Sequence, residues 1–334
     1  MGNKARRILI SRTDSIGDVM LTLPICSWIK DHLDDAQVLF LGKGYTKSVV
    51  EAFEDVDQFH DWAEVKKLDQ AGQKEYLRQL NLDTIIHVFP SKEIAKLAKA
   101  IGIEHRIGTS HRLFHLTTCN ERVSFTRKRS NLHESQLNYE LLRPLGLEMI
   151  PSLEQIIATT QKFKPSEHKL PQDIKQGLSA ERKVILHAKS QGSAVEWPME
   201  KYLELAKSLA SKGVTVYFTG TDSEGSSFRH ELPDNPLIID TTGKLSLEEL
   251  MYFISRVDAL VACSTGPLHI AGYTGIKTIG LFSTRRPIHP GRWKALGENV
   301  QILVNDPSCA TCMSGKECDC ISKISVDRVL DEIG

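Results

Sequence analysis

The sequence has 334 residues, 41% hydrophobic and 25% charged, which is typical of a globular protein with about two domains. Its 42 basic and 42 acidic side chains cancel, and this balance argues against a nucleic-acid-binding protein. No apolar run reaches the ~18 residues of a membrane-spanning helix, and the run after the basic N-terminus, residues 8–10, is too short for a signal peptide. Seven cysteines, three of them scattered, fit a reducing cytoplasm better than a disulfide scaffold.

The first half of the chain alternates short apolar runs with segments of helical spacing. This alternation is typical of a parallel α/β sheet, in which each strand is followed by a helix. The expected strands are residues 7–11, 38–41, 84–89 and 102–108, and the expected helices include residues 63–80 and 92–100.

A segment broken by prolines and polar residues, 144–171, is typical of a linker between domains. After it the same alternation begins again, so we predict an α/β fold of two doubly wound, Rossmann-like domains that face each other across a cleft. The expected domains are residues 1–155 and 172–320, with a C-terminal helix in 321–334 that packs back on the N-terminal domain. The expected strands of the second domain are residues 183–187, 214–219, 237–240, 258–263 and 278–282, and its helices include 201–212 and 247–255, the latter capped by Ser246.

The segment Ser264-Thr265-Gly266-Pro267-Leu268-His269 follows an apolar run that is typical of a buried parallel strand. Pro267 suits the first turn of a helix, Ser264 and Thr265 suit its cap, and Gly266 permits close approach to the backbone. A helix that begins here would point its free N–H groups at the carboxyl edge of the sheet, where a phosphate or diphosphate binds well. The alternative is an ordinary capped helix that binds nothing.

Carboxylates and hydroxyls follow other expected strands. In the first loop, Asp18 would lie near a helix N-terminus beside Asp14, Ser15 and Gly17, and it is either a general base or a simple cap. In the second domain, Lys189 and Ser190 form a plausible phosphate-binding loop, although a lone lysine is usually a solvated charge. After the next strand, Thr221, Asp222 and Glu224 could hold a ribose or cap a helix, and His269 is more often a buried core histidine than a catalyst.

Two basic segments have two interpretations each. Residues 111–142 either form a solvated surface or line a groove for an anionic acceptor such as a lipid phosphate. The loop 285–293 either closes over a nucleotide or sugar or is plain surface. The basic residues expected for the groove are Arg112, Arg122, Arg127, Lys128 and Arg129.

Residues 15–19, Ser-Ile-Gly-Asp-Val, together with residues 264–269 resemble the heptosyltransferases of glycosyltransferase family 9. Glu196-Trp197-Pro198 with Tyr202, residues 220–224 and residues 245–250 add to the resemblance, which covers nearly the whole chain in the right order. It implies a GT-B fold with an acceptor-binding N-terminal domain and a C-terminal domain that binds the nucleotide sugar. It also implies an inverting transferase with no metal and no cofactor, which moves heptose from an ADP-activated donor to a lipopolysaccharide core or other glycolipid.

The resemblance also assigns roles to single residues. The general base falls on Asp18, the phosphate contacts on Lys189, Ser190, Thr265 and Gly266, and the donor-sugar contact on Ser264. Such an enzyme is expected in the cytoplasm, with peripheral contact to the inner membrane. The further donor-binding residues expected are Thr221, Asp222, Glu224, Leu245, Pro267 and His269, and Ser15, Gly17, Arg112 and Arg122 are expected on the acceptor side.

Two positions depart from the family pattern. Ser264 stands where the family often has Asp, and Val195 stands where many members carry Lys. Both lie where the donor sugar and its diphosphate are expected. These departures leave open whether the sugar is heptose and, less strongly, whether the nucleotide is ADP. The alternatives are a GT-B protein that binds without transferring, a transferase for another nucleotide sugar, and a dinucleotide enzyme, against which the missing Gly-x-Gly-x-x-Gly argues.

Four cysteines gather near the C-terminus with the spacing C-x-x-C, then C-x-C: Cys309, Cys312, Cys318 and Cys320. They could bind a structural metal, stay free or form disulfides, and by resemblance related enzymes carry cysteine-rich tails there too.

Overall fold

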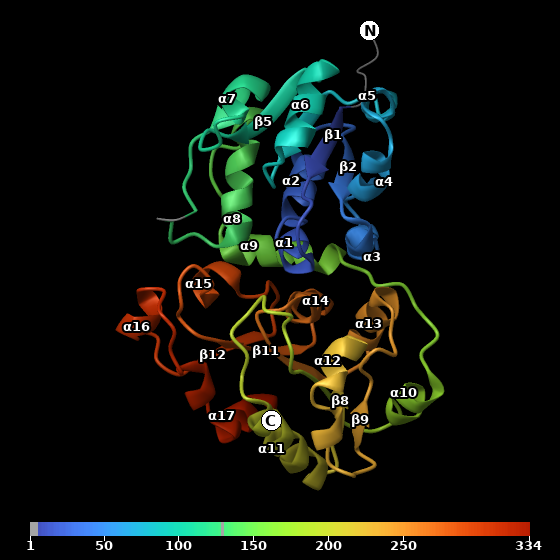
Figure 1. Cartoon of the computed structure of the whole chain (residues 1–334), viewed down its shortest axis with the longest axis vertical. Helices are drawn as coiled ribbons and strands as arrows, with labels where there is room; N and C mark the ends of the chain where they lie inside the picture. Colours follow the sequence, from blue (N-terminus) through green and yellow to red (C-terminus); the bar gives the residue numbers. More distant parts are fainter. Residues whose placement is uncertain (1–5, 128–129) are drawn as a thin grey trace. The chain divides into compact units, whose positions relative to one another are not determined.

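The computed structural model describes residues 6–127 and 130–334, which form two compact units divided between Lys164 and Pro165. Each unit is a six-stranded sheet flanked by helices (Figure 1). All neighbouring strands in both sheets run parallel. The chain therefore has the α/β class predicted from its alternating pattern.

The first unit has the sheet order β3-β2-β1-β4-β5-β6. In chain order its elements are β1 (Arg7–Ser11), α1 (Ile16–Met20), α2 (Pro24–His32), β2 (Gln37–Gly42), α3 (Lys47–Glu51), β3 (Gln58–Asp61), α4 (Trp62–Lys67), α5 (Gln70–Gln79), β4 (Thr84–His87), α6 (Lys92–Ala100), β5 (His105–Thr109), α7 (His115–Thr118), β6 (Glu121–Val123), α8 (Glu134–Tyr139) and α9 (Leu153–Ala158).

The second unit has the sheet order β12-β11-β10-β7-β8-β9. Its elements are α10 (Gln172–Gly177), β7 (Lys183–His187), α11 (Met199–Ser211), β8 (Thr215–Phe218), α12 (Asp222–Ser226), β9 (Ile238–Asp240), α13 (Leu247–Ile254), β10 (Ala259–Cys263), α14 (Gly266–Thr274), β11 (Lys277–Phe282), α15 (Pro290–Trp293), β12 (Val300–Val304), α16 (Ala310–Met313) and α17 (Val326–Ile333).

Both sheets are wound in the same way. The chain moves outward from β1 to β3 and returns to the other side of β1 at β4, and it repeats this course from β7 to β9 and then β10. The strand order therefore reverses between β1 and β4 in the first unit, and between β7 and β10 in the second. In doubly wound sheets ligands bind outside the carboxyl ends of the strands at such a switch point.

The central strands are mostly apolar because both of their faces are covered. Every residue of β4 and β10 is buried, as the continuous apolar run before Ser264 predicts. Helix α14 packs on β10, β11 and α13. Its Gly272 lies so close to the Leu296 carbonyl that an added Cβ would come within 2.4 Å of that oxygen. This close packing fixes the position of the helix start at the edge of the sheet.

The expected strands and the helices 92–100, 201–212 and 247–255 are confirmed with small shifts at their ends. The single helix expected over residues 63–80 is wrong: it is two helices, because Asp69 caps α5 by accepting a hydrogen bond from the Gly72 N–H. The strands β3, β6 and β12 were not predicted. All three lie at an edge of a sheet. β3 and β6 are short and largely polar, so they lack the apolar run of a central strand, whereas β12 is mostly apolar and was simply missed.

The C-terminal helix belongs to the second unit. Val326, Val329 and Ile333 of α17 are buried in the core of that unit, and α17 packs on α11 and β11. The expectation was that residues 321–334 pack back on the N-terminal domain, whereas these apolar residues are buried within the second unit. The apolar face of α17 is used within its own unit.

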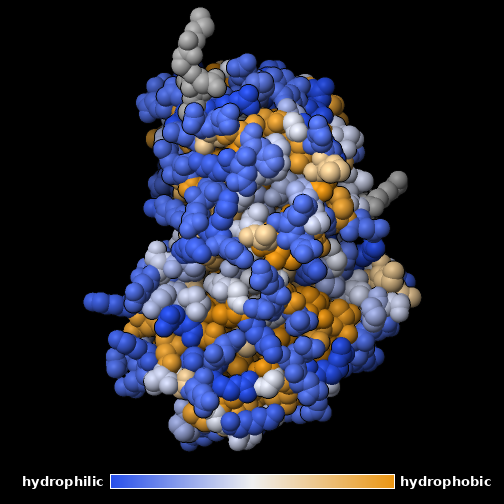
Figure 2. All heavy atoms as spheres, turned by 180° about the vertical axis from the view of Figure 1, so that it is seen from behind, coloured by the Kyte–Doolittle hydropathy of each residue, from blue (hydrophilic) through white to orange (hydrophobic). Residues whose placement is uncertain are grey.

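Polar side chains cover most of the face in Figure 2, with apolar atoms visible between them. Among the large apolar side chains, Leu113 and Met149 are the most exposed of the described residues, at 85% and 82%. Among the helices of the described residues, none combines the length and apolar character needed to cross a membrane.

Candidate functional site

Two groups of predicted site residues lie at the switch points, one in each sheet. In the first unit, Asp18 lies in α1, directly after the loop that follows β1. In the second unit, Lys189 follows β7 and Ser264 follows β10, and the register of these neighbouring strands pairs His187 with Ala262. Two loops about 75 residues apart in sequence therefore start side by side.

A cluster of charged groups surrounds Asp18. Its carboxylate accepts hydrogen bonds from the Arg12 guanidinium and from the Ser15 hydroxyl. Arg12 is almost fully buried, and its Nε lies 2.8 Å from an Asp14 carboxylate oxygen. Its Nη1 lies 4.0 Å from Glu134 of α8. Asp18 is therefore held at the carboxyl edge of the sheet by a buried cation that it shares with two other carboxylates.

The electrostatics of this cluster follow from burial and from close charges. Burial alone would lower the pKa of the Arg12 guanidinium, but Asp14, Asp18 and Glu134 raise it above its usual value. Burial raises the pKa of Asp14 to about 6, although Arg12 beside it acts in the opposite direction. Arg12 therefore stays charged, while Asp14 takes up a proton at a higher pH than an ordinary aspartate does.

The predicted basic groove is only partly free to bind an anion. Arg122 donates to the Leu116 and Cys119 carbonyls, and Arg127 donates to Glu134. Arg112 is exposed on the segment before α7. Lys128 and Arg129 lie outside the described residues.

Helix α14 begins as predicted, with Pro267 in its first turn and Thr265 as the N-cap. The Thr265 side chain makes no capping hydrogen bond. Its hydroxyl oxygen is buried and has no hydrogen-bond partner within the described part of the chain. Since the first turn of a helix leaves backbone N–H groups without intrahelical partners, this start retains donors for a bound anion.

The loop after β7 is ordered by the carboxylate of Glu196, a residue that marks the family resemblance but to which the sequence assigned no role in the site. One Glu196 oxygen accepts from the Ser190 backbone N–H at 2.8 Å and from the Ser190 hydroxyl at 2.9 Å. The other oxygen lies 3.3 Å from the Lys189 ammonium. Glu196 therefore closes residues 189–196 into a compact loop and shares the lysine charge.

A pocket of about 170 Å³ lies beside these loops within the second unit. Ser264 and Val195 line it, together with Ser283, which follows β11, and with Arg285 and Arg286. We call it the arginine pocket. Val195 introduces no charge at the position where the resemblance led us to expect lysine in many members, and two arginines line the same pocket. The basic loop 285–293 was expected either to close over a nucleotide or sugar or to be plain surface. Its first residues line a cavity.

The remaining predicted donor-binding residues have other contacts. Thr221 and Glu224 form the capping box of α12, and Asp222 lies 3.0 Å from Arg229. Leu245 is half-buried just before Ser246, which caps α13 as predicted. His269 is 3% exposed within α14, as expected of a core histidine.

Sequence reasoning gave no role to Arg12 or Glu134, and it named Glu196 only as part of the family resemblance. A signal was present for Arg12, because a charged residue directly after a buried strand must find partners near the sheet edge. Glu134 and Glu196 could not be found in this way, since their partners come from other parts of the fold or from the closure of a loop.

The family model for glycosyltransferase family 9 (heptosyltransferase) matches residues 72–321, well over half of the chain. A Haemophilus influenzae protein named "Putative glycosyltransferase" is 28% identical over 98% of this chain and 95% of its own length.

Two solved structures have the same fold. The E. coli ADP-heptose LPS heptosyltransferase II is 15% identical, with a TM-score of 0.75 over 98% of this chain and 97% of that one. The E. coli heptosyltransferase WaaC, solved with ADP, is 19% identical, with a TM-score of 0.72 over 98% of this chain and 100% of that one.

Proposed function

Because the chain belongs to glycosyltransferase family 9, the heptosyltransferases, and is a glycosyltransferase of the GT-B fold, we propose that it transfers a heptose from ADP-heptose to a lipopolysaccharide core. The second unit binds the donor and the first unit binds the acceptor. The observation that carries the proposal is the convergence of a helix start, Lys189, Ser190 and the arginine pocket at one switch point.

The donor side suits a diphosphate leaving group. The start of α14 offers backbone N–H donors and the positive end of its dipole. Beside it lies the Thr265 hydroxyl, which has no hydrogen-bond partner among the described residues. Lys189, Arg285 and Arg286 add three positive charges around the same edge. In our proposal these fixed cations stabilise the charge that develops on the leaving phosphate, so the reaction needs no metal ion.

The acceptor side supplies the base. The Asp18 carboxylate takes the proton of an acceptor hydroxyl as its oxygen attacks the anomeric carbon of the donor. The bond from that carbon to the phosphate oxygen breaks, and its electron pair leaves with ADP. Attack from the side opposite the leaving group inverts the anomeric centre. Arg12 and Ser15 act as positioning residues, because both hydrogen-bond the Asp18 carboxylate.

The proposal requires that the two units face each other across a cleft, so that Asp18 reaches a donor held by the second unit. A glycolipid acceptor also requires the enzyme to work beside the cytoplasmic face of the inner membrane. The exposed Arg112 and Leu113 suit contact with an anionic lipid surface, since one offers charge and the other an apolar side chain.

A panel of nucleotide sugars tests the proposal. Purified enzyme is incubated with truncated lipopolysaccharide cores and with ADP-heptose, ADP-glucose, GDP-mannose or UDP-glucose. We expect product only with ADP-heptose, with the opposite anomeric configuration by NMR. Because Ser264 and Val195 depart from the family pattern, the panel also tests the donor itself. Faster turnover with another nucleotide sugar would contradict ADP-heptose, and a retained configuration would contradict the single inverting step.

A further inference from the structure

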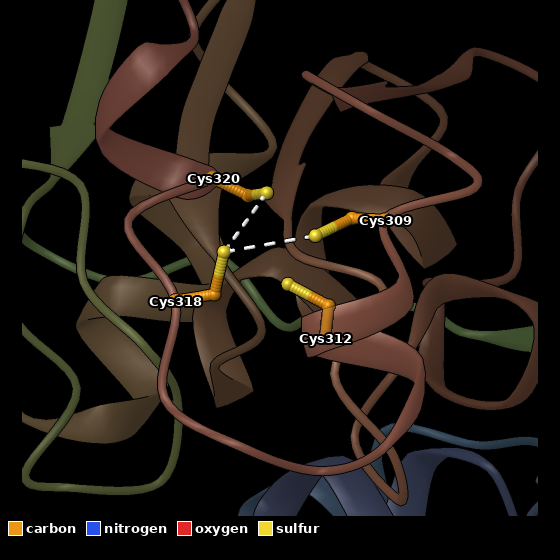
Figure 3. Close-up of side chains that lie close together, drawn as sticks. All are labelled: Cys309, Cys312, Cys318 and Cys320. Carbon is orange, nitrogen blue, oxygen red and sulfur yellow. Dashed lines mark hydrogen bonds between the residues drawn. The ribbon is translucent and has the colours of Figure 1, made fainter.

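The four C-terminal cysteines converge on one point in the second unit. Their sulfur atoms all lie within 4.8 Å of one another, with 3.7 Å between Cys309 and Cys318 and 3.2 Å between Cys318 and Cys320. Figure 3 shows the four side chains pointing toward one another, two from α16 and the residue before it and two from the loop that follows. All four are free thiols, and Cys312 and Cys320 are buried.

This geometry matches a tetrathiolate metal site. Four sulfurs at ~2.3 Å from a central ion lie about 3.8 Å apart along the edges of the tetrahedron. The sulfurs are already close to these separations, and an ion between them would neutralise thiolates brought into one partly buried place. Tetrahedral coordination by four thiolates is selective for zinc or iron over hard cations such as magnesium and calcium.

The same segment supports the arginine pocket. The Cys312 carbonyl accepts from the Arg286 backbone N–H at 3.2 Å, and the Gly315 carbonyl accepts from Arg285 Nε at 3.2 Å. Ile321, the residue after Cys320, lines the pocket. The cysteine loop is therefore the scaffold on which both arginines are held.

We propose that Cys309, Cys312, Cys318 and Cys320 bind one divalent transition-metal ion, zinc or iron, which fixes the loop of Arg285 and Arg286. The ion has a structural role, because all four of its ligand positions are filled by protein. The metal site stands on the cysteine geometry alone. Its effect on the donor rests on the proposed function, since it concerns the pocket assigned to the diphosphate.

Metal analysis tests the site. We expect about one zinc or iron per chain in the purified protein by plasma mass spectrometry, and a loss of most of it in Cys309→Ser. Cys119→Ser, which changes a buried cysteine of the first unit, is the matched control and should retain the metal. If Cys309→Ser does not fold, the wild-type protein is stripped with a chelator and reloaded with Co²⁺, which should give the intense visible bands of tetrahedral thiolate coordination. Purified protein without metal, or with a disulfide among these cysteines, would overturn the site.

ADP binding tests the effect on the pocket. The chelator-treated protein should bind ADP about tenfold more weakly than the metal-loaded protein, the size of effect seen when the support of a site is removed. Adding back zinc or iron should restore the affinity. Equal ADP affinity with and without metal would overturn the link to Arg285 and Arg286 and leave the metal site standing. Failure of the metal-loaded protein to bind ADP at all would instead overturn the proposed donor, as well as this link.

Discussion

At the scale of single residues, the two switch points are built from different chemistry. Around Asp18, one buried arginine is shared by three carboxylates, so the proposed base is held by fixed charges. In the second unit, Glu196 holds Lys189 and Ser190 by accepting their hydrogen bonds. In our proposal neither Arg12 nor Glu196 contacts substrate. Each of them positions a residue that does.

Glu196 gives a prediction that separates loop order from charge. Glu196→Ala should weaken ADP binding about tenfold, because a lost hydrogen bond to a charged group is worth roughly 1.5–3 kcal/mol and the half-exposed site reduces that value. Glu196→Gln should bind ADP within about threefold of wild type, since its amide oxygen still accepts from Ser190 and Lys189 is freed from an ion pair. Calorimetric titration with ADP measures both. Equal losses in the two variants would show that the charge of Glu196, not its hydrogen bonds, matters.

Buried histidines predict how stability depends on pH. Burial lowers the pKa of His87 to about 3, with His115 and Arg106 nearby acting in the same direction. The unfolded chain takes up a proton at this ring below pH ~6.5 and the folded chain does not, so stability is full above pH 6.5 and falls as the pH drops toward 3. At pH 5, protonation of His87 in the unfolded chain lowers the free energy of unfolding by about 2 kcal/mol.

The variant His87→Leu removes the contribution of His87 to the pH dependence of stability. Neither ring nitrogen of His87 has a hydrogen-bond partner in the described part of the chain, so leucine leaves no polar group unsatisfied. Urea unfolding at pH 7 and pH 5 should show a smaller loss of stability in His87→Leu than in wild type. The control is His230→Leu, which changes an exposed histidine. The same pH dependence in His87→Leu and wild type would contradict a neutral buried His87.

At the scale of elements, sequence signals worked where the cause is local. The start of α14 at Gly266-Pro267 and the cap of α13 at Ser246 were both predicted, because proline and hydroxyl residues act within one turn. The break at Asp69 was missed, since the charged helical pattern continues through it. The Thr265 hydroxyl has no hydrogen-bond partner in the described part of the chain, and this could not be predicted either. The direction of an N-cap side chain depends on the packing around the end of the strand.

The cap of α13 gives a prediction for stability. Ser246 accepts from the Glu249 N–H at 3.2 Å, and Glu249 accepts from the Ser246 N–H at 2.8 Å. Ser246→Ala should lower the free energy of unfolding by about 1 kcal/mol. Ser211→Ala, at the far end of α11, changes an exposed serine that caps no helix start and should have a much smaller effect. Chemical denaturation measures both, and equal small losses would mean that the capping box contributes little.

At the scale of the whole molecule, the sequence predicted two parallel α/β units, because apolar runs and helical patterns recur twice around a proline-broken linker. It did not predict the edge strands β3, β6 and β12, each of which pairs with a single neighbouring strand. β3 and β6 are too short and polar to show the apolar run of a central strand. Nor did the sequence place α17, whose apolar face could be buried against either unit until the tertiary structure is known. The candidate site was predictable at the strand ends, whereas the residues that support it depend on long-range contacts.

The central claim is that Asp18 of the first unit removes a proton while the second unit holds the diphosphate. Its most direct test is the rate of heptose transfer from ADP-heptose by Asp18→Asn. Asp69→Asn is the control, because it changes another carboxylate at a helix start in the same unit and asparagine caps equally well. We predict that Asp18→Asn folds, binds ADP like wild type and loses about 10²–10⁴-fold in kcat, while Asp69→Asn is unaffected. Near-normal kcat in Asp18→Asn with intact ADP binding would contradict the account.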